Sequence, residues 1–379
     1  MKINTITCHR VYNHGAALQA WALATFLKME GHEVNIIDYR PDYLCGHFEW
    51  GVNNPIFDKP IVRWLYLAAK YPGWKRSLSR KAVFDVFDKK FIAPLVTRRC
   101  YLAAEELKQN PPIADVYIAG SDQIWNTTFK NGTDPSFYLD FATLKNLKLT
   151  KTISNDFKPK LLSYAASFAT EQLKEGTEDF VKLKLTNFDA VSVRELSGMK
   201  LLESIGYNGT LVCDPVFLID ADIWVSLIAT REGEGESYIL VYDVEGSKDI
   251  QVVAQRLAKV KGLKIYYIGS RNKRYADKNY VNYAPDSFVS LIKNSTYVVS
   301  NSFHATAFSF IFQKQVYVVK RGDGLNTRMQ DLLGRYDIVD RLVDANSNFE
   351  TTIDYRKVNV ILQQEIVNSK AWLLSQIMK

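Results

Sequence analysis

Two patterns of apolar and polar positions alternate along the chain. Residues 3–7 and 34–38 mix β-branched and polar residues over the length of a short strand, and residues 16–27 between them carry apolar side chains at helical spacing. Gly31 follows the helical stretch as a natural C-cap. A strand, a helix and a second strand in this order predict a βαβ unit, whose crossover requires a parallel sheet.

The same alternation continues over the rest of the first 220 residues or so and predicts a doubly wound domain. Further strands are expected at 114–119, 161–168, 190–193 and 211–213, and a charged helix is expected around 171–185. A second series then begins after the glycine-rich residues 233–235. Its expected strands are 238–242, 264–268, 297–299 and 316–319, and its expected helices are 250–260 and 286–293.

We therefore predict an α/β protein with two Rossmann-like domains that face a cleft. The expected first domain covers residues 1–222 and includes a basic insertion at about 42–110, and the second covers 223–357. Residues 358–379 have apolar side chains on one helical face and predict a terminal helix that packs back on the first domain.

The stretch from Ser295 to Phe312 places a single imidazole at a strand-to-helix junction. The strand runs into the polar turn Ser300-Asn301-Ser302, and the helix opens near Phe303 and His304. At the carboxyl end of a parallel strand, a helix N-terminus offers N–H groups and partial positive charge to an anion. An isolated histidine in apolar surroundings is more often a hydrogen-bonded core residue, so both interpretations stay open here. The capping residues of the turn favour the anion site.

Three cations follow the next strand and strengthen the case for anion binding at this junction. They are Lys320, Arg321 and Arg328. Arg194, at the carboxyl end of the 190–193 strand, can fork to a carboxylate or phosphate, or it can pair with its neighbour Glu195.

Two turns near strand ends supply further candidates. Asp122 lies in the stretch Gly120 to Asn126, where it either forms part of an active-site wall or caps the next element. Gly15, which follows Asn13 at the start of the first helix, could let backbone N–H groups approach an anion. The full G-x-G-x-x-G pattern is absent from the sequence, so we infer no dinucleotide site.

Composition limits the class of protein. The chain has 379 residues, of which 47% are apolar and 13% aromatic, as expected of a folded globular protein. Its four cysteines are scattered and include no C-x-x-C pair, so a zinc site or a disulfide framework is not expected and a reducing cytoplasm is favoured. No apolar run reaches the ~18 residues of a membrane span, and the first residues lack the apolar core of a signal peptide.

The net charge of +7 is concentrated in one segment. Residues 63–99 contain ten lysines and arginines against two acidic residues, with four tyrosines and tryptophans among the first of these charges. This mixture suits an anionic membrane interface, nucleic acid is the competing partner, and a solvated helical surface with inward aromatics is the third interpretation.

Six short motifs, taken in order, resemble the polysaccharide pyruvyl transferase family. They are NHGAALQA from Asn13, GSDQIWN from Gly120, SYAASF from Ser163, VSVRE from Val191, CDPVFL from Cys213 and SNSFHATAFSF from Ser300. The resemblance spans roughly residues 3–335. It implies a GT-B-like pair of Rossmann-type domains and transfer of pyruvate from phosphoenolpyruvate onto two sugar hydroxyls as a cyclic ketal, in bacterial surface polysaccharide synthesis.

The resemblance also assigns roles to residues. It makes Arg194 the donor-binding arginine and His304 the key histidine. Many members have Arg-Leu-His where this chain has Ser302-Phe303-His304, so Lys320, Arg321 or Arg328 would have to supply the missing cation, with Ser302 beside the donor.

The implied reaction sets the chemistry that the site must provide. Phosphoenolpyruvate carries about three negative charges, which call for forked cations and a helix N-terminus rather than a metal. His304 would contact the phosphate or transfer protons, and Asp122 would be the second acid or base. Asn13 and Gly15 would contact donor or acceptor. We expect no cofactor and no metal.

The expected partners follow from the same reaction. They are phosphoenolpyruvate, a sugar or lipid-linked oligosaccharide acceptor, and an anionic membrane surface met by residues 63–99; nucleic acid is not expected. The protein would then be cytoplasmic and peripheral on the inner face of the membrane. A GT-B glycosyltransferase that uses a nucleotide sugar and a non-enzymatic basic membrane-surface protein are the alternative functions, since fold alone does not decide between them.

Overall fold

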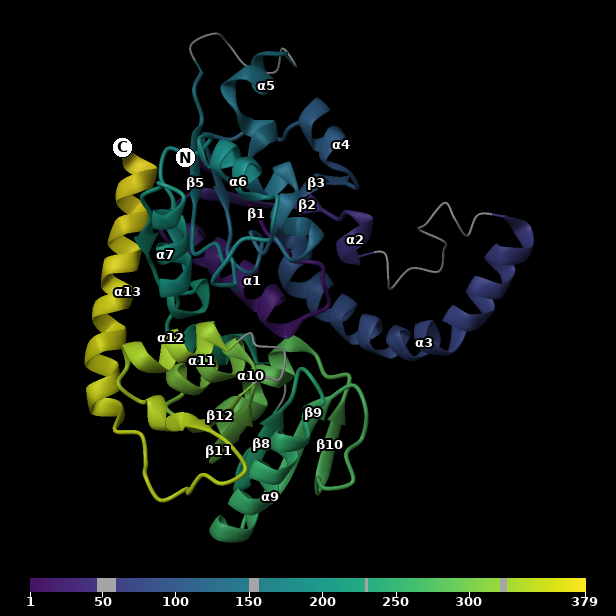
Figure 1. The fold of residues 1–379 in the computed structure, drawn as a ribbon, viewed down its shortest axis with the longest axis vertical. Coiled ribbons are helices and arrows are strands. Elements are labelled where there is room, and N and C mark those ends of the chain that lie inside the picture. The colour runs from purple at the N-terminus through teal and green to yellow at the C-terminus, as the bar shows by residue number, and fades with distance from the viewer. Residues whose placement is uncertain (46–58, 150–156, 229–230, 321–325) are drawn as a thin grey trace.

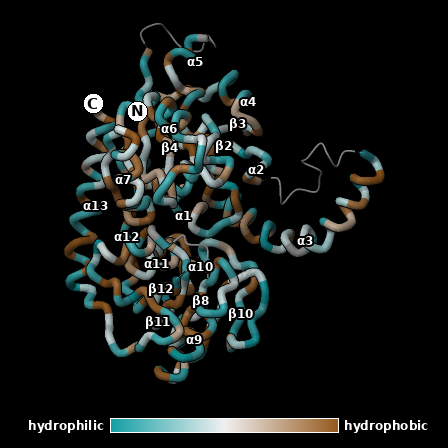
Figure 2. Tube along the Cα trace, viewed as in Figure 1, coloured by the Kyte–Doolittle hydropathy of each residue, from teal (hydrophilic) through white to brown (hydrophobic). Residues whose placement is uncertain are grey.

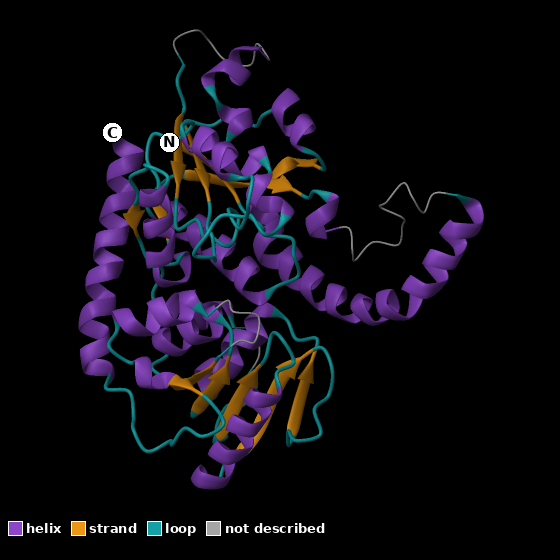
Figure 3. Ribbon diagram, viewed as in Figure 1, coloured by secondary structure: helices purple, strands orange, loops and turns teal. Residues whose placement is uncertain are grey.

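Two parallel β-sheets, each flanked by helices, form the body of the molecule (Figures 1 and 3). The computed structural model describes residues 1–45, 59–149, 157–228, 231–320 and 326–379. The sheets belong to successive parts of the chain, and the last helix runs along the side of both (Figure 1). This is the α/β architecture with two Rossmann-like units that the sequence predicts.

The first sheet has the strand order β3-β2-β1-β4-β5, with every neighbouring pair parallel. Its strands are β1 (Lys2–Ile6), β2 (Glu33–Tyr39), β3 (Val96–Tyr101), β4 (Val116–Ala119) and β5 (Lys160–Ser163). A two-stranded parallel sheet of β6 (Ser192–Val193) and β7 (Thr210–Leu211) extends it through isolated bridges such as that between Leu162 and Ala190.

The predicted first βαβ unit is present, because α1 (His14–Met29) connects β1 to its parallel neighbour β2. The other helices of this half are α2 (Asp42–Cys45), α3 (Pro60–Phe87), α4 (Ala104–Gln109), α5 (Leu144–Leu149), α6 (Glu178–Leu185), α7 (Leu196–Ser204) and α8 (Ala221–Leu227).

The second sheet has the order β10-β9-β8-β11-β12-β13, and all its neighbouring pairs are parallel. Its strands are β8 (Tyr238–Tyr242), β9 (Lys264–Gly269), β10 (Lys278–Val281), β11 (Tyr297–Ser300), β12 (Gln315–Val319) and β13 (Leu342–Val343). Its helices are α9 (Lys248–Lys261), α10 (Pro285–Asn294), α11 (Phe303–Ile311) and α12 (Thr327–Arg335). From β8, the chain places β9 and β10 on one side and β11 and β12 on the other, so the strand order switches sides between β8 and β11. Such a switch point is where ligands bind in open α/β sheets.

A single apolar core joins the two halves. Trp224 packs against Trp21 of α1 and against Phe308 of α11, with ring centroids 5.2 and 4.8 Å apart. Brown apolar stretches run along β11 and β12, whereas outer helices such as α13 (Tyr355–Met378) are banded teal and brown (Figure 2). The halves are therefore held together by buried apolar contacts.

The terminal helix α13 packs back on the first half, as predicted. Ser369 Oγ accepts a hydrogen bond from the Cys213 backbone N–H at 2.9 Å, and the ring of Trp372 lies 6.4 Å from that of Tyr164. Leu373 and Ile377 at the end of the helix are fully buried. Among the residues that the structure describes, helices long enough to cross a bilayer are not apolar enough to do so.

Two sequence predictions about strands are corrected. Residues 96–101 were expected to lie in an insertion, but β3 is the edge strand of the first sheet and pairs with β2. The expected 161–168 strand ends at Ser163, because Ala165 adopts a positive φ angle of 51° that breaks the extended chain. The proposed domain limits at 222 and 357 stay predictions.

Candidate active site between the two sheets

A hollow of about 340 Å³ lies where the carboxyl ends of strands from both sheets face each other. From the first half it is lined by residues that follow β1 and β4, including Cys8, Asn13 and Asp122. From the second half it is lined by Val244, after β8, and by the start of α11. That part consists of Ser302, Phe303 and His304. Four predicted site residues, Asn13, Asp122, Ser302 and His304, therefore meet in one place.

Two helices begin at this hollow. The Asn13 side chain caps α1, with Oδ1 accepting from the backbone N–H groups of Gly15 at 2.9 Å and Ala16 at 3.3 Å. Ser302 caps α11, and its Oγ accepts from the Ala305 N–H at 3.5 Å. Because N-terminal N–H groups carry partial positive charge, the two helix starts together favour an anion here.

Gly15 has a structural role in addition to the ligand contact predicted for it, which stays a prediction. A Cβ atom at this position would lie 1.9 Å from His304 Nδ1, so glycine is needed to make room for the imidazole. The close approach joins the start of α1 to the start of α11. Gly15 thus fixes where the ring of His304 can lie.

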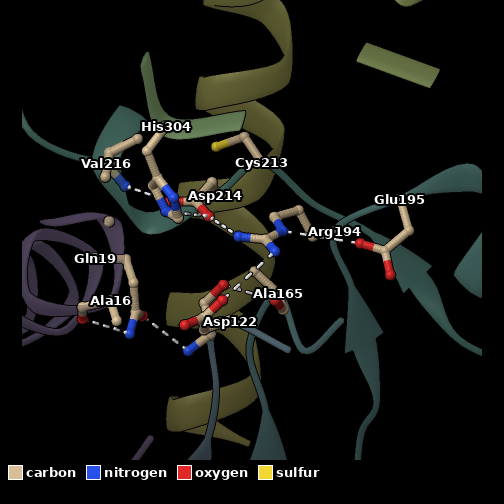
Figure 4. A network of polar contacts seen from close by, with 12 residues as sticks. Ala16, Gln19, Asp122, Ala165, Arg194, Glu195, Cys213, Asp214, Val216 and His304 are labelled. Atoms are coloured by element: carbon tan, nitrogen blue, oxygen red, sulfur yellow. Dashed lines mark hydrogen bonds and ion pairs between the residues drawn. The ribbon is translucent and has the colours of Figure 1, made fainter. Parts of the chain in front are cut away.

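His304 lies at the end of a chain of buried charges. Its Nε2 is 3.7 Å from Asp214 Oδ2, and the same carboxylate oxygen accepts a hydrogen bond from Arg194 Nη1 at 2.5 Å. Asp214 Oδ1 caps the short helix that follows, accepting from the Val216 N–H at 3.0 Å. Figure 4 shows the imidazole beside Asp214, with the Arg194 guanidinium on the other side of that carboxylate. The carboxylate therefore holds both cation-forming groups in position.

The position of Arg194 differs from the donor-binding role expected for it. The side chain is 1% exposed, it is not among the residues that line the hollow, and its guanidinium lies over the Phe303 ring at 4.4 Å. Burial disfavours its charge, but Asp214, Glu195 and Asp122 outweigh that effect and raise the pKa of Arg194 above its ordinary value. Arg194 therefore stays charged. It does not line the hollow itself, but it contacts Asp214, which lies beside His304, and it lies 4.0 Å from Asp122.

Asp122 faces the hollow from the first half. It adopts a positive φ of 71°, and its Oδ1 lies 4.0 Å from Arg194 Nη2. Its backbone carbonyl accepts from the Ser167 N–H at 3.0 Å, and this bond ties the loop after β4 to the irregular stretch after β5. A carboxylate in this position can exchange a proton with a bound ligand.

Several residues of the predicted motifs do not line the hollow but hold Asp122 and Arg194 in position. Gln19 bonds Thr7 Oγ1 and the Ala16 carbonyl through Nε2, and its Oε1 accepts from the Ser121 N–H beside Asp122. Ser192 N–H donates to Ser163 Oγ at 2.8 Å, which aligns β6 so that it delivers Arg194. Several motif residues are thus structural supports of the site.

Asp214 belongs to the site but was not among the residues predicted for it from the sequence. The sequence signal was an aspartate directly before Pro215 at the end of an apolar run, which is a helix-start pattern. A short helix does begin there, as this pattern predicts. The pattern gives no sign, however, that the other carboxylate oxygen of Asp214 contacts both Arg194 and His304.

Of the three predicted cations after β12, Lys320 is the one whose side chain the structure describes. Lys320 is exposed and is not among the lining residues. Arg321 lies outside the described residues, and Arg328 lies in α12 with a side chain outside the description. Within the described part of the chain, no cluster of three or more histidine, cysteine or acidic side chains is arranged to hold a metal ion.

Comparison with known proteins identifies the family. The model of the polysaccharide pyruvyl transferase family matches residues 13–359, which include Asn13, Asp122, Arg194, Asp214 and His304. Curated proteins give no match to the sequence.

Comparison with solved structures identifies the fold. The chain is similar to a UDP-GlcNAc 2-epimerase from Neisseria meningitidis bound to UDP-GlcNAc, with a TM-score of 0.51, 11% identity and 100% of both chains covered. A UDP-GlcNAc 2-epimerase from Methanocaldococcus jannaschii aligns with a TM-score of 0.47 and 9% identity, over 96% of this chain and 92% of that one. At such low identities the likeness shows the fold alone, which is of the two-domain GT-B type.

Proposed function

Because the chain belongs to the polysaccharide pyruvyl transferase family, we propose that it moves pyruvate from phosphoenolpyruvate onto two hydroxyls of a sugar as a cyclic ketal. The acceptor would be a sugar of a bacterial surface polysaccharide or its lipid-linked precursor. The observation that carries the proposal is the hollow in which His304, Asp122 and two helix N-termini converge.

An anionic donor in this hollow would need positively charged or N–H donating groups around it. Arg194 is already neutralised by Asp214, so the donor's carboxylate and phosphate would be met by the starts of α1 and α11 and by the His304 imidazole. We propose that Lys320, Arg321 or Arg328 complete this set when the donor is bound.

The reaction needs one proton delivered to carbon and one carried away with phosphate. A proton adds to the methylene carbon, and the first sugar hydroxyl bonds to the adjacent cationic carbon and loses its own proton. The second hydroxyl then bonds to the same carbon as the carbon–oxygen bond to phosphate breaks, and its proton leaves with the phosphate as hydrogen phosphate. We propose that His304, oriented by Asp214, and Asp122, across the hollow, exchange these protons as acid and base.

Titration calorimetry with phosphoenolpyruvate, UDP-sugars and GDP-sugars tests the donor. We expect phosphoenolpyruvate to bind, and Gly15→Ala to weaken that binding at least about tenfold, because the new Cβ displaces His304. Gly334→Ala is the matched control, since a Cβ at that helical position meets no heavy atom within 4 Å.

A different result would identify a different donor. Binding of a nucleotide sugar alone would overturn the proposal in favour of a GT-B glycosyltransferase. Phosphoenolpyruvate binding that is equal in the wild-type protein and in Gly15→Ala would place the donor outside this hollow.

We further propose that α3 rests on an anionic membrane surface. This helix extends away from the body of the molecule (Figure 1). Near its start, Ile61, Trp64 and Leu65 are 77%, 70% and 57% exposed and lie on one helical face. Exposed apolar residues within a basic segment fit a bilayer interface that carries acidic headgroups.

Vesicle co-sedimentation tests this surface. The triple variant Ile61→Ser, Trp64→Ser, Leu65→Ser should bind phosphatidylglycerol-containing vesicles at least about tenfold more weakly, since burying each such side chain contributes about 1.5–3 kcal/mol. Val360→Ser with Ile361→Ser is the control, because these exposed residues lie on α13. Equal binding to vesicles with and without phosphatidylglycerol would refute the electrostatic part of the proposal.

A further inference from the structure

A second hollow of about 260 Å³ adjoins the first and takes no part in the chemistry above. The two hollows share Asn13 and Val244 as lining residues. The remaining walls of the second come from α3, from His14 at the start of α1, from the ends of β8 and β9, and from the loops that follow β8, β9 and β10. Adjoining hollows are what a reaction between two substrates requires, because the reacting atoms must meet at their boundary.

We infer that this second hollow is the acceptor subsite and binds a neutral pyranose, with Asp243 as the carboxylate that receives its hydroxyls. The assignment to an acceptor rests on the proposed function. The assignment to a sugar rests on the residues of the hollow itself.

Asp243 directly follows β8 and is 8% exposed. Its Oδ1 is fixed by three donors, the backbone N–H groups of Glu245 and Gly246 at 3.0 Å each and Asn301 Nδ2 at 2.9 Å. Its Oδ2 is buried and has no hydrogen-bond partner among the described residues. A buried carboxylate oxygen without a donor is costly, and a sugar hydroxyl would satisfy it.

Aromatic and polar groups line the rest of the hollow. Phe84 of α3, Tyr242 at the end of β8 and Tyr283 after β10 supply rings, and Asn282 with Ser270 supplies polar groups. Rings that pack on the C–H faces of a sugar, with a few polar groups at its edge, form the usual lining of such a site.

The charges of this hollow differ from those of the first. Arg80 and Asp243 are its two charged lining residues, and they balance. Both Arg80 Nε and Nη2 already donate to the Tyr12 carbonyl, at 3.0 and 2.7 Å. An anionic donor is therefore not favoured here, whereas a neutral polyol is.

His14 adds no charge to these walls. Burial, helped by Arg80, lowers the pKa of His14 to about 3, so the ring is neutral at physiological pH. Its Nε2 lies 3.0 Å from the Tyr283 carbonyl, which can only accept, so Nε2 carries the proton and Nδ1 accepts from the Tyr242 hydroxyl at 3.1 Å. His14 thus fixes two of the aromatic walls without attracting an anion.

Saturation-transfer NMR with methyl galactoside, glucoside and mannoside tests the subsite in the full-length protein. Asp243→Asn keeps Oδ1 and removes the charged Oδ2, and should weaken pyranoside binding at least about tenfold. Ser270→Trp, at an exposed lining position, should block the hollow without disturbing the core. Asp249→Asn is the control, because that aspartate is exposed and lies outside the hollow.

Phosphoenolpyruvate affinity, measured on the same samples, separates this inference from the proposed function. Loss of pyranoside binding in both variants with unchanged phosphoenolpyruvate affinity supports the subsite. Pyranoside binding that depends on Asp243 in a protein that does not bind phosphoenolpyruvate supports the subsite and refutes the pyruvyl transfer. A wild-type protein that binds none of the pyranosides, or variants that bind them as well as wild type, overturn the subsite.

Discussion

Replacing His304 with asparagine should lower kcat for pyruvyl transfer about 10²–10⁴-fold while leaving the fold intact. The imidazole lies in the hollow, 3.7 Å from the Asp214 carboxylate that orients it, and an amide cannot exchange protons as an imidazole does. Release of inorganic phosphate from phosphoenolpyruvate in the presence of acceptor measures the effect.

Two controls make this experiment decisive. His32→Asn changes a half-buried histidine beyond the end of α1 and should leave kcat unchanged. Thermal unfolding of His304→Asn should remain close to that of the wild type, because asparagine is smaller and can still hydrogen-bond. Turnover within a factor of two of the wild type would remove His304 from the chemistry.

Strands and helices that depend on local pattern could be predicted from the sequence. Residues 238–242 form a buried apolar run, and β8 has those bounds. The strand, turn and helix around His304 were also found, because Ser302 is a strong N-cap and the apolar period changes there. Both elements lie in the centre of a sheet, where burial makes the pattern clear.

Elements at the edge of a sheet could not be found in this way. β3 reads VTRRCY, and Arg98 and Arg99 are exposed because an edge strand needs no apolar partner on that side. The SYAASF stretch reads as a strand to its end, but tertiary contacts turn the chain at Ala165. Local propensity did not reveal either outcome.

The sequence could predict where the site lies but not which of its residues contact one another. Parallel strands bring Asp122 and His304 to facing edges, which topology implies. The sequence left Arg194 either binding the donor or pairing with its neighbour Glu195, and it gave no sign of Asp214, twenty residues later in the chain, which accepts its hydrogen bond. Gly15 was predicted to contact a ligand, but the sequence gave no sign that the packing of α1 against α11 requires a glycine there to make room for His304. Contacts between distant segments decide each case.

Removing Arg194 should destabilise the whole protein, which makes it the second large effect. Arg194→Met leaves the fully buried Asp214 without its cation, and such a change costs about 3–5 kcal/mol of unfolding free energy. Urea unfolding measures this loss. The control Arg356→Met breaks the exposed pair with Asp354 and should change stability by less than about 0.5 kcal/mol.

A double variant shows whether Arg194 acts through Asp214 or on the donor. Adding Asp214→Asn to Arg194→Met removes the unpaired charge, so it should restore a substantial part of the lost unfolding free energy. A direct donor contact predicts the opposite result for the single variant, namely weak phosphoenolpyruvate binding at an unchanged urea midpoint. The 1% exposure of Arg194 and its 2.5 Å bond to Asp214 favour the first outcome, in which the arginine orders the carboxylate beside His304.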